Sequence, residues 1–209
     1  MPQALNPVQS ATADEIREAA LQQFAKVGYE ATTMRTIAGS VGIKAASLYN
    51  HFSSKEEILW DLTHTALVEL VGHRDAAFAE LPATAGASAH LEAFVRAHVG
   101  FHATHQDQAA LVNGQLGSLS AAHFQKAVSR RDAYQNSLQL VIGGGVAGGD
   151  FAVPDLRMAT FAILEMGMAV SLWYRKSGAL AVNELCEVYV QLAQKILAPQ
   201  PRVGGRVSQ

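Results

Sequence analysis

Few of the features that mark a specialised class of protein are present in this chain of 209 residues. It contains one cysteine, Cys186, so no disulfide can form within the chain, which suits a reducing cytosol. The N-terminal residues lack the basic start and the apolar run of a signal peptide. The longest apolar stretch, 158–170, is shorter than a membrane span and contains Glu165. We therefore expect a soluble, cytoplasmic protein.

Charge of neither sign is in excess, and this counts against DNA binding. The chain has 16 Lys and Arg against 18 Asp and Glu, with a net charge of −2. Its first 60 residues hold five basic residues (positions 17, 26, 35, 44 and 55) and six acidic ones (14, 15, 18, 30, 56 and 57). A nucleic-acid-binding domain usually carries a basic patch. DNA binding is therefore expected only if the acidic side chains point away from the basic ones.

What the sequence does contain is helical periodicity. Apolar residues recur three and four positions apart, as in Leu185, Val188, Leu192 and Ile196, and β-branched residues form no alternating runs. With 49% hydrophobic residues, the chain can bury a substantial core. We predict an all-α fold of about nine helices. We expect an N-terminal module at 11–60 and a larger helical domain at 61–200.

Capping residues and glycines predict the helix ends. The first helix should run from Thr12 or Asp14 to Lys26, because Gly28 stops it, and Thr32 or Thr33 can cap a short second helix that ends near Ser40. Ser54 should cap a long helix that reaches about Glu80. The other expected helices span 44–51, 86–105, 107–117, 120–143, 155–176 and 181–197.

A glycine-rich segment, LQLVIGGGVAGGDF, places Gly143, Gly145 and Gly148 in the G-x-G-x-x-G spacing of a dinucleotide-binding loop. Such a loop must open a helix, because the helix N-terminus binds the pyrophosphate. Here the glycines lead into DFAVPD, and no βαβ pattern surrounds them. We interpret the segment as the end of a helix that frays near residue 143, since glycine in a helix interior costs about 1 kcal/mol.

The segment KAASLYNHF, residues 44–52, carries the strongest functional signal. On a helical wheel, Ala45, Leu48 and Phe52 form a buried stripe. The opposite face presents Lys44, Ala46, Ser47, Asn50 and His51, with Tyr49 at the border. A short helix precedes this segment and Gly42 makes the turn, so the pair predicts a helix-turn-helix. Short mixed side chains suit the base edges of a major groove. The alternative is a packed two-helix corner without a function.

Residues 14–62 resemble the DNA-binding domain of the TetR family of bacterial transcriptional regulators, notably in AALQQFAKVGYEATTMRTIA, SVGI and LYNHFSSKEEIL. The resemblance covers about a quarter of the chain. It implies an all-helical homodimer that binds operator DNA through three N-terminal helices and pairs through its last two helices. It also implies a C-terminal domain that binds a small-molecule inducer, and in most members repression. The matching positions are Phe24, Gly28, Thr33, Ile37, Ala38, Gly42, Leu48, Tyr49, His51, Phe52 and Lys55.

The resemblance also implies roles for individual residues. Thr33 is similar to a phosphate contact, and Arg35 to a contact with a guanine edge or a phosphate. Lys44, Ala45, Ala46 and Ser47 would face bases or nearby backbone, with Asn50 on the same exposed face. Tyr49, His51 and Lys55 match positions that bind the DNA backbone. The alternatives are a core-edge aromatic for Tyr49, a surface or capping residue for His51 and a solvated lysine for Lys55.

The C-terminal domain shows no catalytic signature, so no enzyme activity and no cofactor are expected. His98, His102 and His105 would share one helix face and could bind zinc, but no cysteine accompanies them. Pocket lining or a solvated face is favoured over a metal site. Glu165 lies in an apolar run, where a buried acid needs a partner, so we expect it to pair across a dimer interface or to line a cavity. The rival functions are an all-helical enzyme that uses His98, His102 and Glu165, and an adaptor without DNA binding.

A weaker resemblance, in RRDAYQNSLQLVI and SLWYRKSGALAVNEL, is to TetR regulators of fatty-acid, acyl-CoA and steroid catabolism. It implies an acyl-CoA effector, with Arg130 and Arg131 on its phosphates. The rival effector is an uncharged hydrophobic drug or metabolite, and the rival role of both arginines is solvation. The other candidate pocket residues are Phe94, His98, Phe101, Leu111, Leu116, Tyr134 and Met168.

Overall fold

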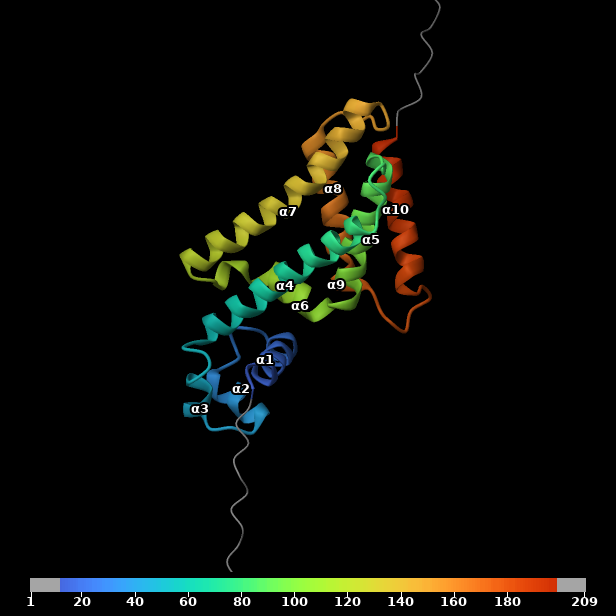
Figure 1. Ribbon diagram of the computed structural model, residues 1–209. Helices are drawn as coiled ribbons and strands as arrows, with labels where there is room; N and C mark the ends of the chain where they lie inside the picture. Colours follow the sequence, from blue (N-terminus) through green and yellow to red (C-terminus); the bar gives the residue numbers. More distant parts are fainter. Residues whose placement is uncertain (1–11, 199–209) are drawn as a thin grey trace, which may run out of the picture. The chain divides into compact units, whose positions relative to one another are not determined.

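The computed structural model describes residues 12–198, and every regular element in that range is helical, which confirms the predicted all-α fold. The elements are α1 Ala13–Val27, α2 Met34–Val41, α3 Ala45–Tyr49, α4 Lys55–Ala79, α5 Ala87–Thr104, α6 Gln106–Gln115, the 3-10 turn η1 Leu116–Ser118, α7 Ala121–Gly148, α8 Leu156–Met168, α9 Val170–Trp173 and α10 Val182–Leu197 (Figure 1). The single helix expected at 155–176 is divided into α8 and α9.

The N-terminal helix ends lie where the capping residues predict them. The Thr12 hydroxyl accepts a hydrogen bond from the backbone N–H of Glu15, and the Glu15 carboxylate accepts one from the backbone N–H of Thr12. Thr33 caps α2 in the same way through Thr36. Ser54 accepts from the N–H of Glu57 in the first turn of α4. These local bonds satisfy N–H groups that have no partner within a helix.

The chain packs as two compact units. Unit 1 comprises the described residues up to Val68 together with His105–Arg130, and unit 2 comprises Glu69–Thr104 together with the described residues from Arg131 onward. Helices α4 and α7 each contribute residues to both units. The α6 segment therefore packs with the N-terminal helices, although it lies far from them in the sequence.

Unit 1 has a continuous apolar core. Ile16, Ala20 and Phe24 form the buried face of α1, four residues apart as one helix face requires. The same core contains Ile37, Ala38, Leu48, Ile58, Leu59, Leu62, Leu111, Leu119 and Ala127. The buried side of the predicted helix-turn-helix is thus confirmed, and Leu111 of α6 and Ala127 of α7 belong to the same core.

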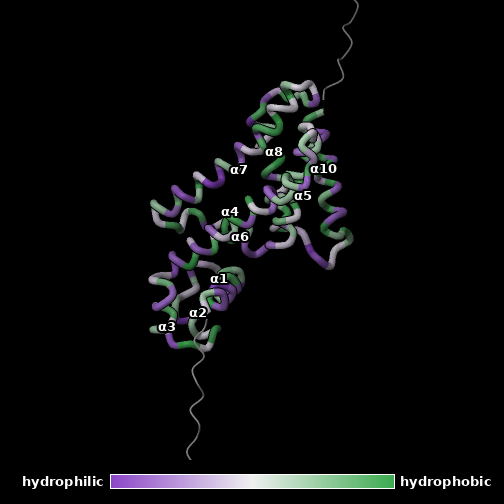
Figure 2. Tube along the Cα trace, in the orientation of Figure 1, coloured by the Kyte–Doolittle hydropathy of each residue, from purple (hydrophilic) through white to green (hydrophobic). Residues whose placement is uncertain are grey.

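Unit 2 is built around α5, which packs along α10 and also contacts α8 and α9 (Figure 1). Leu185, Val190 and Ala193 of α10 are buried. Hydrophilic and hydrophobic residues alternate along α10 (Figure 2). A second apolar row on this helix, Val188, Leu192 and Ile196, is 42%, 42% and 37% exposed. This helix therefore has more apolar surface than one chain buries.

The expectation that α7 frays near residue 143 is wrong, because the helix continues to Gly148. Gly145 is buried, and its carbonyl accepts hydrogen bonds from the backbone N–H groups of Asp150 and Phe151. A Cβ at Gly145 would lie 2.1 Å from the Phe151 ring. Tertiary packing thus outweighs the helix propensity of glycine. The glycines lie at the C-terminal end of a helix, which confirms the preferred interpretation over a nucleotide-binding loop.

The apolar helical stretch in unit 2 is longer than expected. Leu156–Trp173 spans 18 residues with a mean hydropathy of 1.3, which by length and composition alone is enough to cross a membrane. Ile163 and Leu164 of this stretch are buried. Glu165 is exposed in the single chain, so it is not a buried acid there, and its pairing across a dimer interface stays a prediction. Exposed Leu172 and Trp173 at its end extend the apolar surface of unit 2.

Replacing each of two neighbouring glycines by alanine, one at a time, distinguishes the effect of packing on stability from the effect of helix propensity. Gly145→Ala should lower the free energy of unfolding by about 1–3 kcal/mol, because the new methyl group overlaps the Phe151 ring. Gly144→Ala is the matched control in the same helix, where a Cβ meets nothing within 4 Å. It should raise stability by about 0.5–1 kcal/mol. Urea denaturation measures both, and equal effects would refute the packing explanation.

Candidate functional site

The candidate DNA-binding helix α3 is held in place by a few local contacts. Leu48 is fully buried and Ala45 packs against the same core. Gly42 adopts the left-handed conformation, with a φ of 78°, and ends α2. The backbone N–H of Ile43 then donates to the carbonyl of Ala38 at 3.0 Å. The tight turn and one buried face orient α3, as a helix-turn-helix requires.

The other side of α3 is a surface of mixed polar groups. Tyr49 is 54% exposed. Lys44 is the N-cap residue that precedes the helix, and its side chain makes no capping hydrogen bond. The structure exposes Lys44, Ala46, Asn50 and His51 together and leaves Ser47 and Ala45 half-buried. Donors, acceptors and a methyl group therefore lie together on a helix narrow enough for a major groove.

The α2 candidates occupy the first turn of that helix. The Thr33 hydroxyl caps it by accepting from the N–H of Thr36 at 3.2 Å, yet the residue is exposed. Arg35 is also exposed, and among residues 12–198 it has no ion pair. Arg35 is therefore available to an external phosphate or base, whereas the Thr33 hydroxyl already has a local partner.

Lys55 has an intramolecular role that sequence reasoning missed. Its ammonium group donates to the carbonyl of Tyr29 at 2.7 Å and lies 4.1 Å from the centre of the Tyr29 ring. It thereby joins the start of α4 to the loop between α1 and α2. A lysine followed by two acids in the first turn of a helix gives no sequence signal of such a contact, because the partner is a backbone carbonyl 26 positions away.

The acidic side chains of unit 1 are mostly engaged with other groups. Asp14 and Asp61 both pair with Arg17, and hydrogen bonding to Asp61 raises the pKa of that arginine. Glu18 accepts a hydrogen bond from Gln22.

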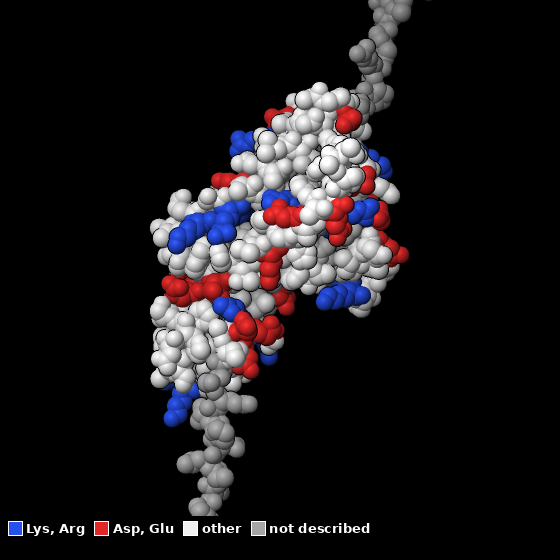
Figure 3. Space-filling view, viewed as in Figure 1, with Lys and Arg blue, Asp and Glu red and all other residues white. Residues whose placement is uncertain are grey.

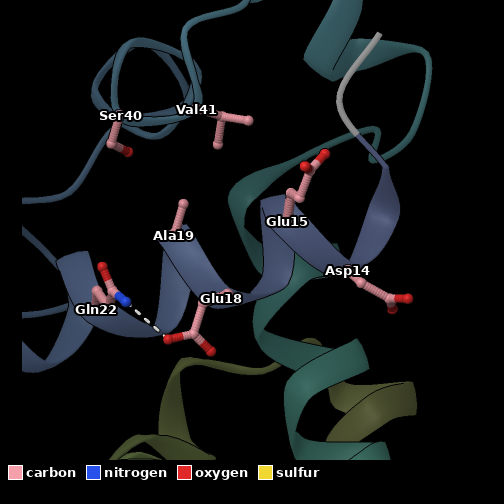
Figure 4. Close-up of a pocket in the computed structure, with 7 residues that line it drawn as sticks. All are labelled: Asp14, Glu15, Glu18, Ala19, Gln22, Ser40 and Val41. Atoms are coloured by element: carbon pink, nitrogen blue, oxygen red, sulfur yellow. Dashed lines mark hydrogen bonds between the residues drawn. The ribbon is translucent and has the colours of Figure 1, made fainter. Parts of the chain in front are cut away.

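Asp14, Glu15 and Glu18 line a groove on α1 that Ser40 and Val41 of α2 complete (Figure 4). The face shown in Figure 3 has no continuous basic surface around α1–α3. Lys44, like Arg35, has no ion pair in the described part of the chain.

Unit 2 contains a buried polar network centred on His98. The Nε2–H of His98 donates to the carbonyl of Leu164 at 3.1 Å, so Nδ1 accepts from the hydroxyl of Tyr134 at 3.2 Å. Gly167 makes room for the ring, since a Cβ there would lie 2.4 Å from His98 Cδ2. Burial lowers the pKa of His98 to about 4. The imidazole is therefore neutral at pH 7.

The structure brings together only some of the candidate effector-binding residues. Phe94, His98 and Tyr134 are mutual neighbours, with the Phe94 and Tyr134 rings 4.9 Å apart. Phe101 is buried in the same unit, and Arg131 lies 3.9 Å from the sulfur of Met168. In contrast, Leu111 belongs to the core of unit 1 and Leu116 packs against that core. Arg130 is the last residue of unit 1 and is exposed.

The expectation of three histidines on one helix is wrong. Helix α5 ends at Thr104, and His105 precedes α6 in unit 1. His98 and His102 are both buried, with ring centres 4.6 Å apart.

Arg74 is a polar contributor to unit 2 that sequence reasoning did not identify. Its guanidinium lies 5.5 Å from the centre of the Tyr134 ring and donates to the Ser137 hydroxyl at 2.9 Å. Burial raises the pKa of Tyr134, while the charge of Arg74 opposes that shift. Arginine commonly stacks on aromatic faces, but the separation of 63 positions between Arg74 and Ser137 hides this contact in the sequence.

Comparison with known proteins agrees with this architecture. The family described as "Bacterial regulatory proteins, tetR family" matches residues 16–62, and the family described as "Tetracyclin repressor-like, C-terminal domain" matches residues 84–197. The second match alone covers more than half of the chain. The chain therefore belongs to the TetR family of transcriptional regulators, which confirms the resemblance seen in the sequence.

Individual relatives extend over most of the chain. The transcriptional repressor KstR2 of Mycolicibacterium smegmatis is 31% identical over 187 residues, which cover 86% of this chain and 87% of that protein. A tetR-family regulatory protein from Rhodococcus RHA1 has a TM-score of 0.84 at 29% identity and covers 93% of this chain and 100% of its own. KstR2 of Mycobacterium tuberculosis, described as a ketosteroid transcriptional regulator, has a TM-score of 0.81 at 25% identity, with coverage of 93% and 100%.

The buried His98 should make stability depend on pH. The unfolded imidazole takes up a proton below pH 6.5, whereas the folded one does so only near pH 4. The free energy of unfolding should thus be highest above pH 6.5 and fall on acidification, by about 2 kcal/mol between pH 7.5 and 5 from this group. His98→Gln removes the titrating group and should lose this part of the pH dependence. Urea denaturation at both pH values measures it, and an unchanged dependence in the variant would contradict the assignment.

Proposed function

We propose that the protein is a ligand-responsive repressor that binds a palindromic operator and releases it when a small hydrophobic effector binds. The observation that carries the proposal is the exposed polar face of α3, held outward by the buried Leu48. Family membership and the relatives named as repressors support it. A regulator, rather than an enzyme or an adaptor without DNA binding, accounts for both halves of the chain. Such a protein acts in the cytoplasm.

The proposed DNA contacts are the exposed side chains of α2, α3 and the residues that follow α3. Arg35 and Lys44 supply free positive charge, and Tyr49 and His51 supply donors to phosphate. Lys55 would reach DNA only by releasing its bonds to the α1–α2 loop, so we assign it the weakest contact. The full proposed set is Thr33, Arg35, Lys44, Ala45, Ala46, Ser47, Tyr49, Asn50, His51 and Lys55.

The proposed assembly is a homodimer. The exposed apolar row Val188, Leu192 and Ile196 on α10, with Leu172 and Trp173 after α8, supplies a surface that a second copy could cover. Two recognition helices would then enter major grooves separated by about 34–36 Å or somewhat more. We assign the DNA-binding function to residues 11–60 and the dimerisation and effector functions to 61–200.

The proposed effector is an acyl-CoA thioester, of a fatty acid or a steroid-derived acid. The description of KstR2 as a ketosteroid transcriptional regulator supports a steroid-related effector. Phe94, Phe101 and Tyr134 lie in the buried core of unit 2, and Arg131 beside Met168 offers a guanidinium for phosphate. An uncharged hydrophobic metabolite is the alternative, because the buried His98 network is neutral at pH 7.

Removal of the Lys44 charge tests the DNA contacts. Lys44→Ala should weaken binding to DNA from the upstream region of its own gene, and should reduce the slope of log K against log salt by about 1 for each phosphate that a protomer no longer binds. Fluorescence anisotropy at several salt concentrations measures both. Lys26→Ala is the matched control, an exposed lysine of unit 1 at the end of α1, and should bind like the wild type. Equal slopes for both variants would exclude the Lys44 assignment.

Release of the operator by candidate effectors tests the ligand class. One class of acyl-CoA should weaken operator binding by about 5–150-fold, whereas coenzyme A alone should not. Arg131→Ala should need a higher thioester concentration for release while its operator affinity without effector stays unchanged. Arg157→Ala, an exposed arginine of α8, is the control. Release only by uncharged hydrophobic compounds would overturn the acyl-CoA proposal and leave the repressor intact.

A further inference from the structure

The first turns of α4 and α7 bring together three side chains that the proposed repressor function does not use. Glu56 and Glu57 begin α4, and His123 lies in the first turn of α7. One potential ligand atom from each residue lies within 4.8 Å of the other two. All three residues are half-buried and belong to unit 1. We propose that Glu56, Glu57 and His123 form a binding site for a divalent transition-metal ion such as Zn²⁺.

The histidine is held in a defined orientation. Its ring stacks on Trp60, with centroids 4.5 Å apart and planes 3° from parallel. Its Nδ1 lies 2.9 Å from a carboxylate oxygen of Glu56. Glu56 also accepts a hydrogen bond from the backbone N–H of Ser120 at 2.7 Å. The Trp60 ring and the Ser120 N–H lie outside the proposed ligand set, and outer contacts of this kind position the ligands of metal sites in advance.

The charged groups around the cluster are compatible with a bound cation. Among residues 12–198, the Glu57 carboxylate has no hydrogen bond or ion pair, although it lies close to the Glu56 carboxylate. Lys126 lies over the Trp60 ring, 5.7 Å from its centre, and Lys55 is directed to the Tyr29 carbonyl. The helix dipole favours acids in the first turn of α4, but it does not account for an imidazole from α7 beside both of them.

The ligand set points to a class of ion. Two carboxylates and one imidazole suit Zn²⁺, Mn²⁺ and related ions, whereas Mg²⁺ prefers oxygen ligands only. Three protein ligands would leave positions for water. A bound ion would join the first turn of α4 to the first turn of α7 within unit 1. The sequence hides this site, because Glu56 and His123 are 67 positions apart.

Calorimetry on the full-length protein, freed of metal with EDTA, tests the site with Zn²⁺. The wild type should bind Zn²⁺ and should bind Mg²⁺ at least about tenfold more weakly. Glu57→Gln keeps the side-chain volume and leaves the bonds of Glu56 to His123 and Ser120 in place, so the fold should be retained. It should weaken Zn²⁺ binding at least about tenfold. Glu18→Gln, an acid on α1, is the matched control and should bind like the wild type.

A second variant and a fluorescence signal from Trp60 distinguish metal binding at this site from metal binding by other histidines of the chain. His123→Gln should also weaken Zn²⁺ binding at least about tenfold. In a Trp173→Phe background only Trp60 emits, since the chain has 2 tryptophans, and saturating Ni²⁺ should quench its fluorescence. The proposal is overturned if the wild type takes up no Zn²⁺ at about 100 µM. It is equally overturned if Glu57→Gln and His123→Gln both bind Zn²⁺ like the wild type. Neither outcome bears on operator binding, which is measured separately.

Discussion

Burial of Leu48 is the contact on which the DNA-binding surface depends. An isolated helix shorter than about 12–15 residues is marginally stable in water, and α3 has only 5 residues. Leu48 is the buried residue of this helix, and it enters a core built from α1, α2 and α4. Because the helix is anchored by that face, the residues on the opposite face must point outward. The outward position of the polar residues is therefore a consequence of the buried Leu48 on the opposite face.

Sequence reasoning predicts this part of the chain well because its signals are local. The caps at Thr12, Thr33 and Ser54 and the turn at Gly42 depend on neighbours within a few positions, and the buried stripe follows from helix geometry. The exposed polar face of α3 could thus be derived from the order of the residues alone. The Lys55 contact with Tyr29 could not, because its acceptor is a backbone carbonyl distant in sequence.

Predictions failed where long-range packing decides the outcome. Propensity alone ends α7 near residue 143, but Phe151 packs against the glycine face and the helix continues. Glu165 lies in an apolar sequence, yet it occupies an exposed position of α8 in the single chain. Leu111, a candidate pocket residue, belongs to the core of unit 1 through α6, a position that its sequence neighbours do not indicate.

The His98 network gives unit 2 a specific packing that apolar contacts alone would not define. It links α5, through His98, to Tyr134 of α7 and to the Leu164 carbonyl of α8. A buried donor without its acceptor costs about 1–3 kcal/mol, so a shift of any of these helices by one turn would be penalised. Apolar side chains tolerate such a shift more easily, since their contacts have little direction. The polar groups therefore hold three helices in register around the residues that we propose to meet the effector.

The nearly neutral charge of the chain is compatible with DNA binding once the pairing of its charges is known. Counting residues sets six acids against five bases in the first 60 positions. In the folded protein, Asp14 pairs with Arg17, whereas Arg35 and Lys44 have no ion pair among the described residues. Phosphate binding depends on the positive charges that are free at the contact surface, not on the sum over the chain. A dimer would present each free charge twice, so a modest number in each copy is sufficient.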